Sequence, residues 1–233
     1  MNQPRCWAAI PAAGIGRRMR AGRPKQYLEL GGRRVIDHTL ARFVGHPAIH
    51  RVVVALHPED PYWPDCAHAG HARVHTVAGG AERADSVLRL LDWLLQQEAA
   101  DDWVLVHDAA RPCLPRADLE RLLARAGAHP VGGLLAAPVA DTMKRDDAHG
   151  AVRETVPREG LWHALTPQMF RVGMLHRALG DALARGHLVT DDAGAMELAG
   201  HHPLLVEGSR ANLKITRPED LPLAAFLLEE EKD

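Results

Sequence analysis

The sequence is poor in cysteine, and its three cysteines form no recognisable pattern. Cys6, Cys66 and Cys113 are odd in number and far apart, and no Cys-x-x-Cys pair occurs. This spacing argues against a disulfide framework and against a thiolate metal site. It favours reduced thiols, and we expect a cytoplasmic protein.

Long apolar runs and an excess of charge of one sign are also missing. No run approaches the roughly 18 residues of a membrane-spanning helix, and the apolar run after Arg5 stops at Pro11, too early for a signal peptide. The 28 basic and 30 acidic residues leave a formal net charge of −2. Nucleic-acid-binding domains usually carry a strong positive charge. We therefore expect neither a membrane nor a nucleic acid as a partner.

What the chain does contain is an alternation of β-type and helix-type apolar patterns. With 233 residues, 46% of them hydrophobic, it is long enough for one α/β domain over residues 1–233. The alternation predicts a Rossmann-like, mostly parallel twisted sheet with helices on both faces. We expect strands at 6–10, 52–56, 74–77, 103–106, 134–138, 161–170, 204–207 and 212–215. We expect helices at 35–44, 86–97, 114–126, 172–185, 191–198 (with Thr190 as N-cap) and from Pro218 onward.

Residues 139–160 interrupt this alternation. The segment is polar and turn-rich, and Asp146, Asp147 and Gly150 are placed like the tip of a hairpin. It cannot bury much apolar surface against its own domain. We interpret it as an inserted, protruding β-arm used for dimerisation; a mobile surface hairpin is the alternative.

The segment 11–30 combines small residues with positive charge directly after the first predicted strand. Gly14 and Gly16 have no side chains, so the backbone N–H groups of the loop can approach a ligand closely. Five cations then follow within nine residues: Arg17, Arg18, Arg20, Arg23 and Lys25. The pattern predicts a loop that wraps a polyphosphate. It is not a Walker loop, because no Gly-Lys-Ser/Thr follows, and Met19 replaces the third glycine of a dinucleotide fingerprint.

Three further marked segments lie at the ends of predicted strands: 78–86, 107–112 and 212–216. Ligands of open α/β sheets bind at the carboxyl ends of the strands. One topology would therefore gather these segments and the opening loop at a single edge. Each segment also has a purely structural interpretation, such as a tight turn or a capping aspartate.

Together these segments resemble the 2-C-methyl-D-erythritol 4-phosphate cytidylyltransferase family. The motifs are PAAGIGRRM at 11–19, PKQ at 24–26, ERADSV at 82–87, HDAARP at 107–112, LTPQ at 165–168 and TDD at 190–192. The resemblance implies a homodimeric nucleotidyltransferase that converts CTP and a sugar-alcohol phosphate, with Mg²⁺ or another divalent cation, into a CDP-alcohol and pyrophosphate. The pathway would be the non-mevalonate route to isoprenoids.

The resemblance also implies roles for individual residues. Arg18 and Lys25 would be catalytic, stabilising the α-phosphate and the leaving pyrophosphate. Nucleotide contacts would come from Ala12, Ala13, Gly14, Gly80, Ala81, Ser86 and Asp108, the last also a candidate Mg²⁺ ligand. Substrate-positioning residues would be Lys214, Arg111, Thr166, Thr190 and, from the arm of a neighbouring subunit, Thr142 and Arg158. Ala81 stands where relatives can carry an acidic residue, so only a backbone contact is expected there.

Two alternatives stay open at this point. A ribitol 5-phosphate cytidylyltransferase would share the nucleotide half of the site. A non-catalytic nucleotide-binding protein would keep the loop without turnover, although the intact Arg18, Lys25, Asp108 and Lys214 argue against it.

Overall fold

A computed structural model describes residues 4–14 and 22–230 of the chain. Its centre is a seven-stranded sheet in the order β11-β7-β10-β6-β1-β4-β5. The strands are β1 (Cys6–Pro11), β4 (Arg51–Leu56), β5 (Val74–Ala78), β6 (Trp103–Val106), β7 (Gly132–Pro138), β10 (Trp162–Arg171) and β11 (Leu204–Glu207). Every neighbouring pair is parallel except the two that contain β10. The prediction of a mostly parallel α/β sheet is therefore confirmed.

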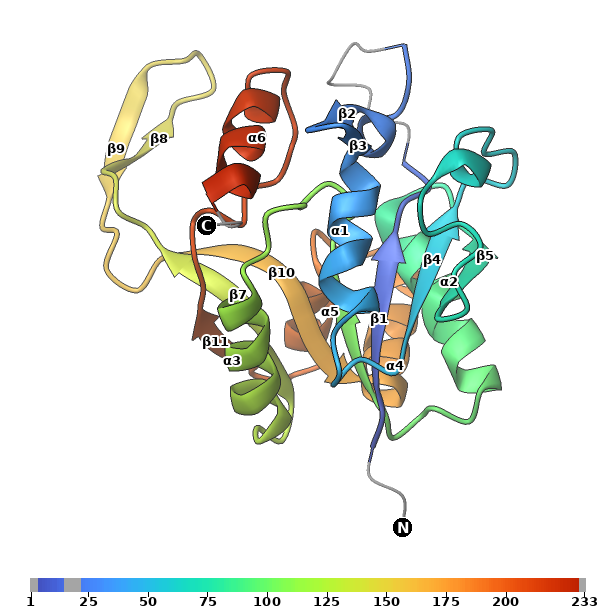
Figure 1. The fold of residues 1–233 in the computed structure, drawn as a ribbon. Helices are drawn as coiled ribbons and strands as arrows, with labels where there is room; N and C mark the ends of the chain where they lie inside the picture. The colour runs from blue at the N-terminus through green and yellow to red at the C-terminus, as the bar shows by residue number, and fades with distance from the viewer. Residues whose placement is uncertain (1–3, 15–21, 231–233) are drawn as a thin grey trace.

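Helices cover both faces of this sheet, as predicted (Figure 1). One face carries α1 (Val35–Val44) and α3 (Arg116–Gly127), and the other carries α2 (Arg83–Gln96), α4 (Val172–Ala184) and α5 (Asp192–Leu198). Successive side chains of a strand point to opposite faces. In β1, accordingly, Ala8 and Ile10 pack with α1, whereas Trp7 and Ala9 pack with α2 and α4. The last helix, α6 (Asp220–Glu230), packs beside α1 in a third, smaller apolar cluster.

Small elements connect the opening loop to α1. A 3₁₀ turn, η2 (Lys25–Tyr27), leads into the two-stranded hairpin of β2 (Glu29–Leu30) and β3 (Arg33–Arg34). A second 3₁₀ turn, η3 (Trp63–Asp65), follows β4. Tyr27 is fully buried, and its hydroxyl donates to Asp60 at 2.7 Å. The segment that follows the opening loop is thus anchored in the core.

The inserted segment forms a hairpin that stands apart from the main sheet. Strands β8 (Met143–Asp146) and β9 (Val152–Val156) pair antiparallel as a separate two-stranded sheet. Figure 1 shows this arm projecting from the body near α6. Its use in dimerisation stays a prediction.

Two local predictions are wrong. Residues 212–215 form no strand, because their backbone groups bond to loops: Ile215 N–H donates to the Ala110 carbonyl at 2.8 Å, and the Asn212 carbonyl accepts from Arg111. Thr190 does not cap α5. The cap is Asp191, whose carboxylate accepts the Gly194 N–H at 2.9 Å, a stronger acceptor for a helix N-terminus than a hydroxyl.

Three helix starts also differ from the predicted positions. Helix α2 begins at Arg83 rather than 86, because Glu82 and Asp85 form a reciprocal capping box. Helix α3 begins at Arg116, after Pro115 at the N-cap. Helix α6 begins at Asp220, whose carboxylate accepts from the backbone of the preceding turn.

None of the helices in the described ranges has the length and apolar character that crossing a membrane requires.

Candidate active site

The carboxyl ends of the parallel strands border a cleft of about 350 Å³, which we call the first cleft. Four segments that are distant in the sequence line it, as the strand-end argument predicted. All seven predicted nucleotide-contacting residues lie in its wall: Ala12, Ala13, Gly14, Gly80, Ala81, Ser86 and Asp108. Lys25 and Lys214 line it as well.

A second cleft of about 240 Å³ adjoins the first. Four of the predicted substrate-positioning residues line it: Arg111, Thr166, Thr190 and Lys214. Arg83, Asp108 and Lys214 belong to the walls of both clefts. The boundary between the clefts is therefore a charged group of side chains.

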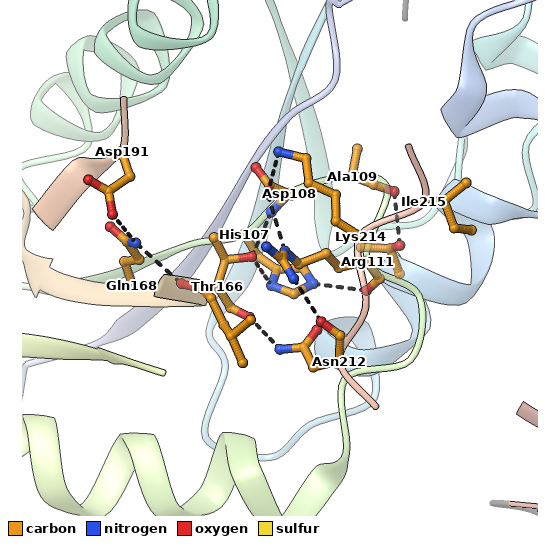
Figure 2. A network of polar contacts seen from close by, with 12 residues as sticks. His107, Asp108, Ala109, Arg111, Thr166, Gln168, Asp191, Asn212, Lys214 and Ile215 are labelled. Carbon is orange, nitrogen blue, oxygen red and sulfur yellow. Dashed lines mark hydrogen bonds and ion pairs between the residues drawn. The ribbon is translucent and has the colours of Figure 1, made fainter. Parts of the chain in front are cut away.

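Asp108 is the centre of this charged group. Its Oδ1 accepts from Arg83 Nε at 3.1 Å, and its Oδ2 lies 2.9 Å from Lys214 Nζ and 3.3 Å from Arg111 Nε. Figure 2 shows Lys214 and Arg111 converging on this carboxylate. Burial would raise the pKa of Asp108, but Arg83, Lys214 and Arg111 lower it well below its usual range. One ionised carboxylate thus faces three cations, and the surplus is positive.

Arg83, which was not among the predicted site residues, lines both clefts. Besides Asp108, it binds both oxygens of Asp192, at 2.8 and 3.2 Å, in a bidentate pair. Burial would lower the pKa of Arg83, but Asp192 and Asp108 raise it, so it stays charged. The signal in the sequence was its place in the ERADSV motif at 82–87; the structure adds that Arg83 is the first residue of α2, where the helix dipole disfavours a cation.

The glycines before α2 are required by close packing. A Cβ on Gly79 would lie 2.3 Å from the Cβ of Ala13, and one on Gly80 would lie 2.2 Å from that of Asp85. The N–H of Gly80 donates to Ser86 Oγ at 3.0 Å, and this hydroxyl lies 3.1 Å from the Glu82 carbonyl that it donates to. The hydroxyl of Ser86 therefore holds the loop, which leaves backbone groups as the contacts for a ligand.

The two sides of the first cleft are joined by Lys25 and Gln26. Lys25 Nζ donates to the Ile215 carbonyl at 2.8 Å, which brings the opening loop to the segment of Lys214. The amide of Gln26 donates to the carbonyls of Ala12 at 2.7 Å and of Gly14 at 3.0 Å. Gln26 thereby fixes the start of the loop, a role that its sequence position did not indicate. Arg18, the other predicted catalytic residue, lies outside the described residues.

Buried amides support the second cleft. Gln168 donates to Asp191 at 2.9 Å and accepts from the Ala193 N–H at 2.7 Å, which fixes the start of α5. The amide of Asn212 donates to the Thr166 carbonyl at 2.7 Å, and Arg111 donates to the Asn212 carbonyl at the same distance (Figure 2). Both amides lie in segments that the sequence marked, 165–168 and 212–216, but the sequence indicated no role for either side chain.

Two predicted residues are not brought to the site within one chain. Thr142 and Arg158 lie on the arm and, in the described part of this chain, line neither cleft. Arg158 donates to the carbonyl of Ala140, also on the arm. Their predicted role requires the second cleft of another subunit and stays a prediction.

The described residues contain no group of three or more His, Cys, Asp or Glu side chains suited to hold a metal ion. Asp108 lines both clefts, but both of its oxygens already face cations. Mg²⁺ is usually held by one or two carboxylates together with substrate phosphates. These side chains therefore fit a metal ion that is held mainly by the phosphates of a nucleoside triphosphate. They do not form a site that would hold the ion without the nucleotide.

Comparisons with known proteins agree on one family. Its sequence profile, described as 2-C-methyl-D-erythritol 4-phosphate cytidylyltransferase, matches residues 6–230. A protein of that name from Pseudomonas paraeruginosa is 60% identical over 221 residues, 94% of each chain. One from Pseudomonas putida is 58% identical over 219 residues, 94% of this chain and 93% of the relative.

Solved structures give the same result. The crystal structure of a 4-diphosphocytidyl-2C-methyl-D-erythritol synthase superposes with a TM-score of 0.86 at 40% identity, covering 97% of this chain and 100% of the other. The structure of the Francisella tularensis 2-C-methyl-D-erythritol 4-phosphate cytidylyltransferase gives 0.84 at 33% identity, covering 96% and 99%. The likeness therefore covers nearly the whole chain.

Proposed function

The chain belongs to the 2-C-methyl-D-erythritol 4-phosphate cytidylyltransferase family, and we propose how its own residues carry out the reaction of that family. The protein is a nucleotidyltransferase of the non-mevalonate isoprenoid pathway. It converts CTP and 2-C-methyl-D-erythritol 4-phosphate into CDP-methylerythritol and pyrophosphate. The observation that carries the proposal is the Asp108 group, which lies in the walls of both clefts.

The two clefts divide the substrates between them. The first cleft has the glycine loop and the opening loop, whose backbones suit a base and a triphosphate. The second has Arg111 and hydroxyl side chains, which suit a phosphorylated sugar alcohol. Lys214 borders both and has a half-buried side chain, so its Nζ can reach a phosphate placed between them.

The reaction is an in-line displacement. A phosphate oxygen of the sugar phosphate attacks the α-phosphorus of CTP, and the bond from that phosphorus to the bridging oxygen of the β-phosphate breaks. The attacking phosphate is already ionised at neutral pH, so no general base is required. Two anions must nevertheless approach each other. Catalysis therefore depends on positioning and on charge neutralisation, which the surplus cations around Asp108 supply.

Among the described residues, we assign to Lys25 the stabilisation of the transition state. It lines the first cleft, and its Nζ is held at the Ile215 carbonyl, next to Lys214 in the chain. There it would stabilise the charge that develops on the α-phosphate and on the leaving pyrophosphate. Arg18 shares this assignment through its motif alone.

Recognition of cytosine falls to the backbone of Gly80 and Ala81. The Ser86 hydroxyl orients the loop by accepting from Gly80 and donating to Glu82. Cytosine offers an amino donor and ring acceptors, which backbone carbonyl and N–H groups can pair with. Ala81 contributes no polar side chain, so the contact there is a backbone contact.

Mg²⁺ is the proposed cofactor. Phosphate oxygens of CTP would hold most of its coordination sphere, with Asp108 as the carboxylate on the wall of both clefts. When bound, the ion neutralises phosphate charge. The protein residues orient the nucleotide so that its α-phosphorus faces the second cleft.

We further propose one nucleotidyltransferase domain over residues 1–233 and a homodimer. In the dimer, Thr142 and Arg158 of the 139–160 arm would complete the second cleft of the partner. The protrusion of the arm and the exposure of its residues support this assignment. A cytoplasmic location is part of the same proposal.

The assay is pyrophosphate release from CTP with 2-C-methyl-D-erythritol 4-phosphate, with ribitol 5-phosphate in a parallel reaction. We expect turnover with the methylerythritol phosphate. Turnover with ribitol phosphate alone would assign the second cleft to the other sugar. Tight CTP binding without turnover on either would indicate a non-catalytic binding protein.

A further inference from the structure

His107 uses both of its ring nitrogens inside the core. Nε2 lies 3.0 Å from the carbonyl oxygen of Arg111, and Nδ1 lies 2.9 Å from Oγ1 of Thr166 (Figure 2). The residue is completely buried. Its ring therefore ties strand β10 to the loop that carries Asp108 and Arg111.

The partners determine where the protons are. A carbonyl oxygen can only accept, so Nε2 of His107 must carry the hydrogen that it donates to Arg111. The ring is completely buried and its hydrogen-bond partners are a carbonyl and a hydroxyl, neither of which carries a charge, so the buried ring is neutral. The Nδ1 atom of a neutral ring in this tautomer has a lone pair and no hydrogen. The Thr166 hydroxyl must therefore donate to His107.

This leaves the Thr166 hydroxyl without a hydrogen for any other partner. Its oxygen also accepts the N–H of Asp108 at 3.1 Å. A hydroxyl oxygen can accept two hydrogen bonds, so one lone pair is left. Ionised phosphate oxygens are acceptors, and this hydroxyl cannot donate to them.

We propose that His107 is a positioning residue: it orients the Thr166 hydroxyl as an acceptor for a hydroxyl group of the sugar-alcohol substrate. The phosphate of that substrate is then left to Lys214 and Arg111, which line the second cleft with Thr166. This assignment rests on the proposed function. It gives the second cleft two distinct ends. At one end the cations bind the phosphate, and at the other Thr166 accepts a hydrogen bond from a hydroxyl group of the substrate.

The first test needs neither activity nor a variant of the catalytic group. Long-range ¹H–¹⁵N spectra of histidine-labelled wild-type protein report the tautomer of each ring, and the His107 signal is assigned by its loss in His107→Gln. We expect a neutral ring with the hydrogen on Nε2 at pH 7. An imidazolium, or a neutral ring with the hydrogen on Nδ1, would overturn the proposal.

The second test is a double-mutant cycle on the steady-state constants. His107→Gln and Thr166→Val should each raise the KM for the sugar phosphate about tenfold, the effect of one lost hydrogen bond, with kcat and the KM for CTP within about twofold. The double variant should resemble the more affected single variant, because His107 acts through Thr166. Effects that multiply, or equal rises in both KM values, would overturn it.

Two further variants separate positioning from general damage. Thr166→Ser keeps the hydroxyl and should retain the wild-type KM for the sugar phosphate; a KM like that of Thr166→Val would count against the proposal. His46→Gln changes another buried histidine, one that lines neither cleft among the described residues, and should keep all constants. If wild-type protein released no pyrophosphate, the proposed function would fail, whereas the tautomer measurement would still decide the role of His107.

Discussion

The guanidinium of Arg83 lies 3.1 Å from the carboxylate of Asp108, and the same guanidinium binds Asp192 at 2.8 Å. One cation at the start of α2 thus connects the loop after β6 with the start of α5. Both carboxylates are buried, whereas about a quarter of the Arg83 side chain is exposed. Because Arg83 lines both clefts, we expect its position to affect both substrates.

Asp192→Asn tests this connection. The substitution removes the charge that holds Arg83 from one side and nearly keeps the side-chain volume. We expect kcat/KM to fall about tenfold or more for CTP and for the sugar phosphate alike, as measured by pyrophosphate release. Asp65→Asn, in an exposed ion pair with Arg34, is the matched control and should change neither constant. A loss confined to one substrate would contradict the shared position.

Lys25→Ala tests the transition-state assignment. We expect kcat to fall by about 10²-fold or more, because a cation aimed at developing phosphate charge is lost. The measurement is the steady-state rate at saturating concentrations of both substrates. Lys144→Ala, on the exposed arm, provides the lysine control. An unchanged kcat in Lys25→Ala would remove Lys25 from the catalytic residues.

Arg158→Ala tests the arm. We expect a higher KM for the sugar phosphate with an unchanged KM for CTP, because the arm would complete only the second cleft of the partner. Mixing this variant with Lys25→Ala, after unfolding and refolding together, should restore activity. In a mixed dimer one site receives Lys25 from one subunit and Arg158 from the other. Failure to recover activity in mixtures shown to contain the heterodimer would place Arg158 in its own subunit's site or in none.

His107 predicts a pH dependence of stability. Burial lowers its pKa from 6.5 to about 4, so between these values the unfolded chain binds a proton that the folded chain does not. The free energy of unfolding should therefore decrease as the pH falls through this window, by about 1 kcal/mol per pH unit from this residue. Urea unfolding at pH 7.5 and pH 5 measures it, and His107→Gln should show a smaller decrease. Equal decreases would show that His107 is not the titrating group.

The sequence predicted those parts of the molecule that local patterns determine. The apolar runs predicted all seven strands of the main sheet, and the small residues and glycines around Ala13 and Gly80 predicted the loops that need close approach. The strand-end argument placed Asp108 in the cleft correctly; Lys214 reaches the same cleft from a loop and not from the predicted strand.

What the sequence did not reveal depends on contacts between distant segments. Residues 212–215 have the composition of a strand, yet tertiary bonds to Ala110 and Arg111 replaced a sheet partner. Gln26 and Gln168 are ordinary polar residues until the fold buries them against carbonyl and carboxylate groups. Arg83 lies in the ERADSV motif, but its link between two carboxylates depends on the fold, which places Asp108 and Asp192 beside it.

The central claim is that two adjoining clefts hold the two substrates on either side of the Asp108 group. A crystal structure with a non-hydrolysable CTP analogue, Mg²⁺ and the sugar phosphate tests it most directly. We predict the cytosine against the backbone of Gly80 and Ala81, and the sugar phosphate in the second cleft with its phosphate at Lys214. A nucleotide that occupied the second cleft, or phosphates bound away from Lys214 and Lys25, would contradict the account.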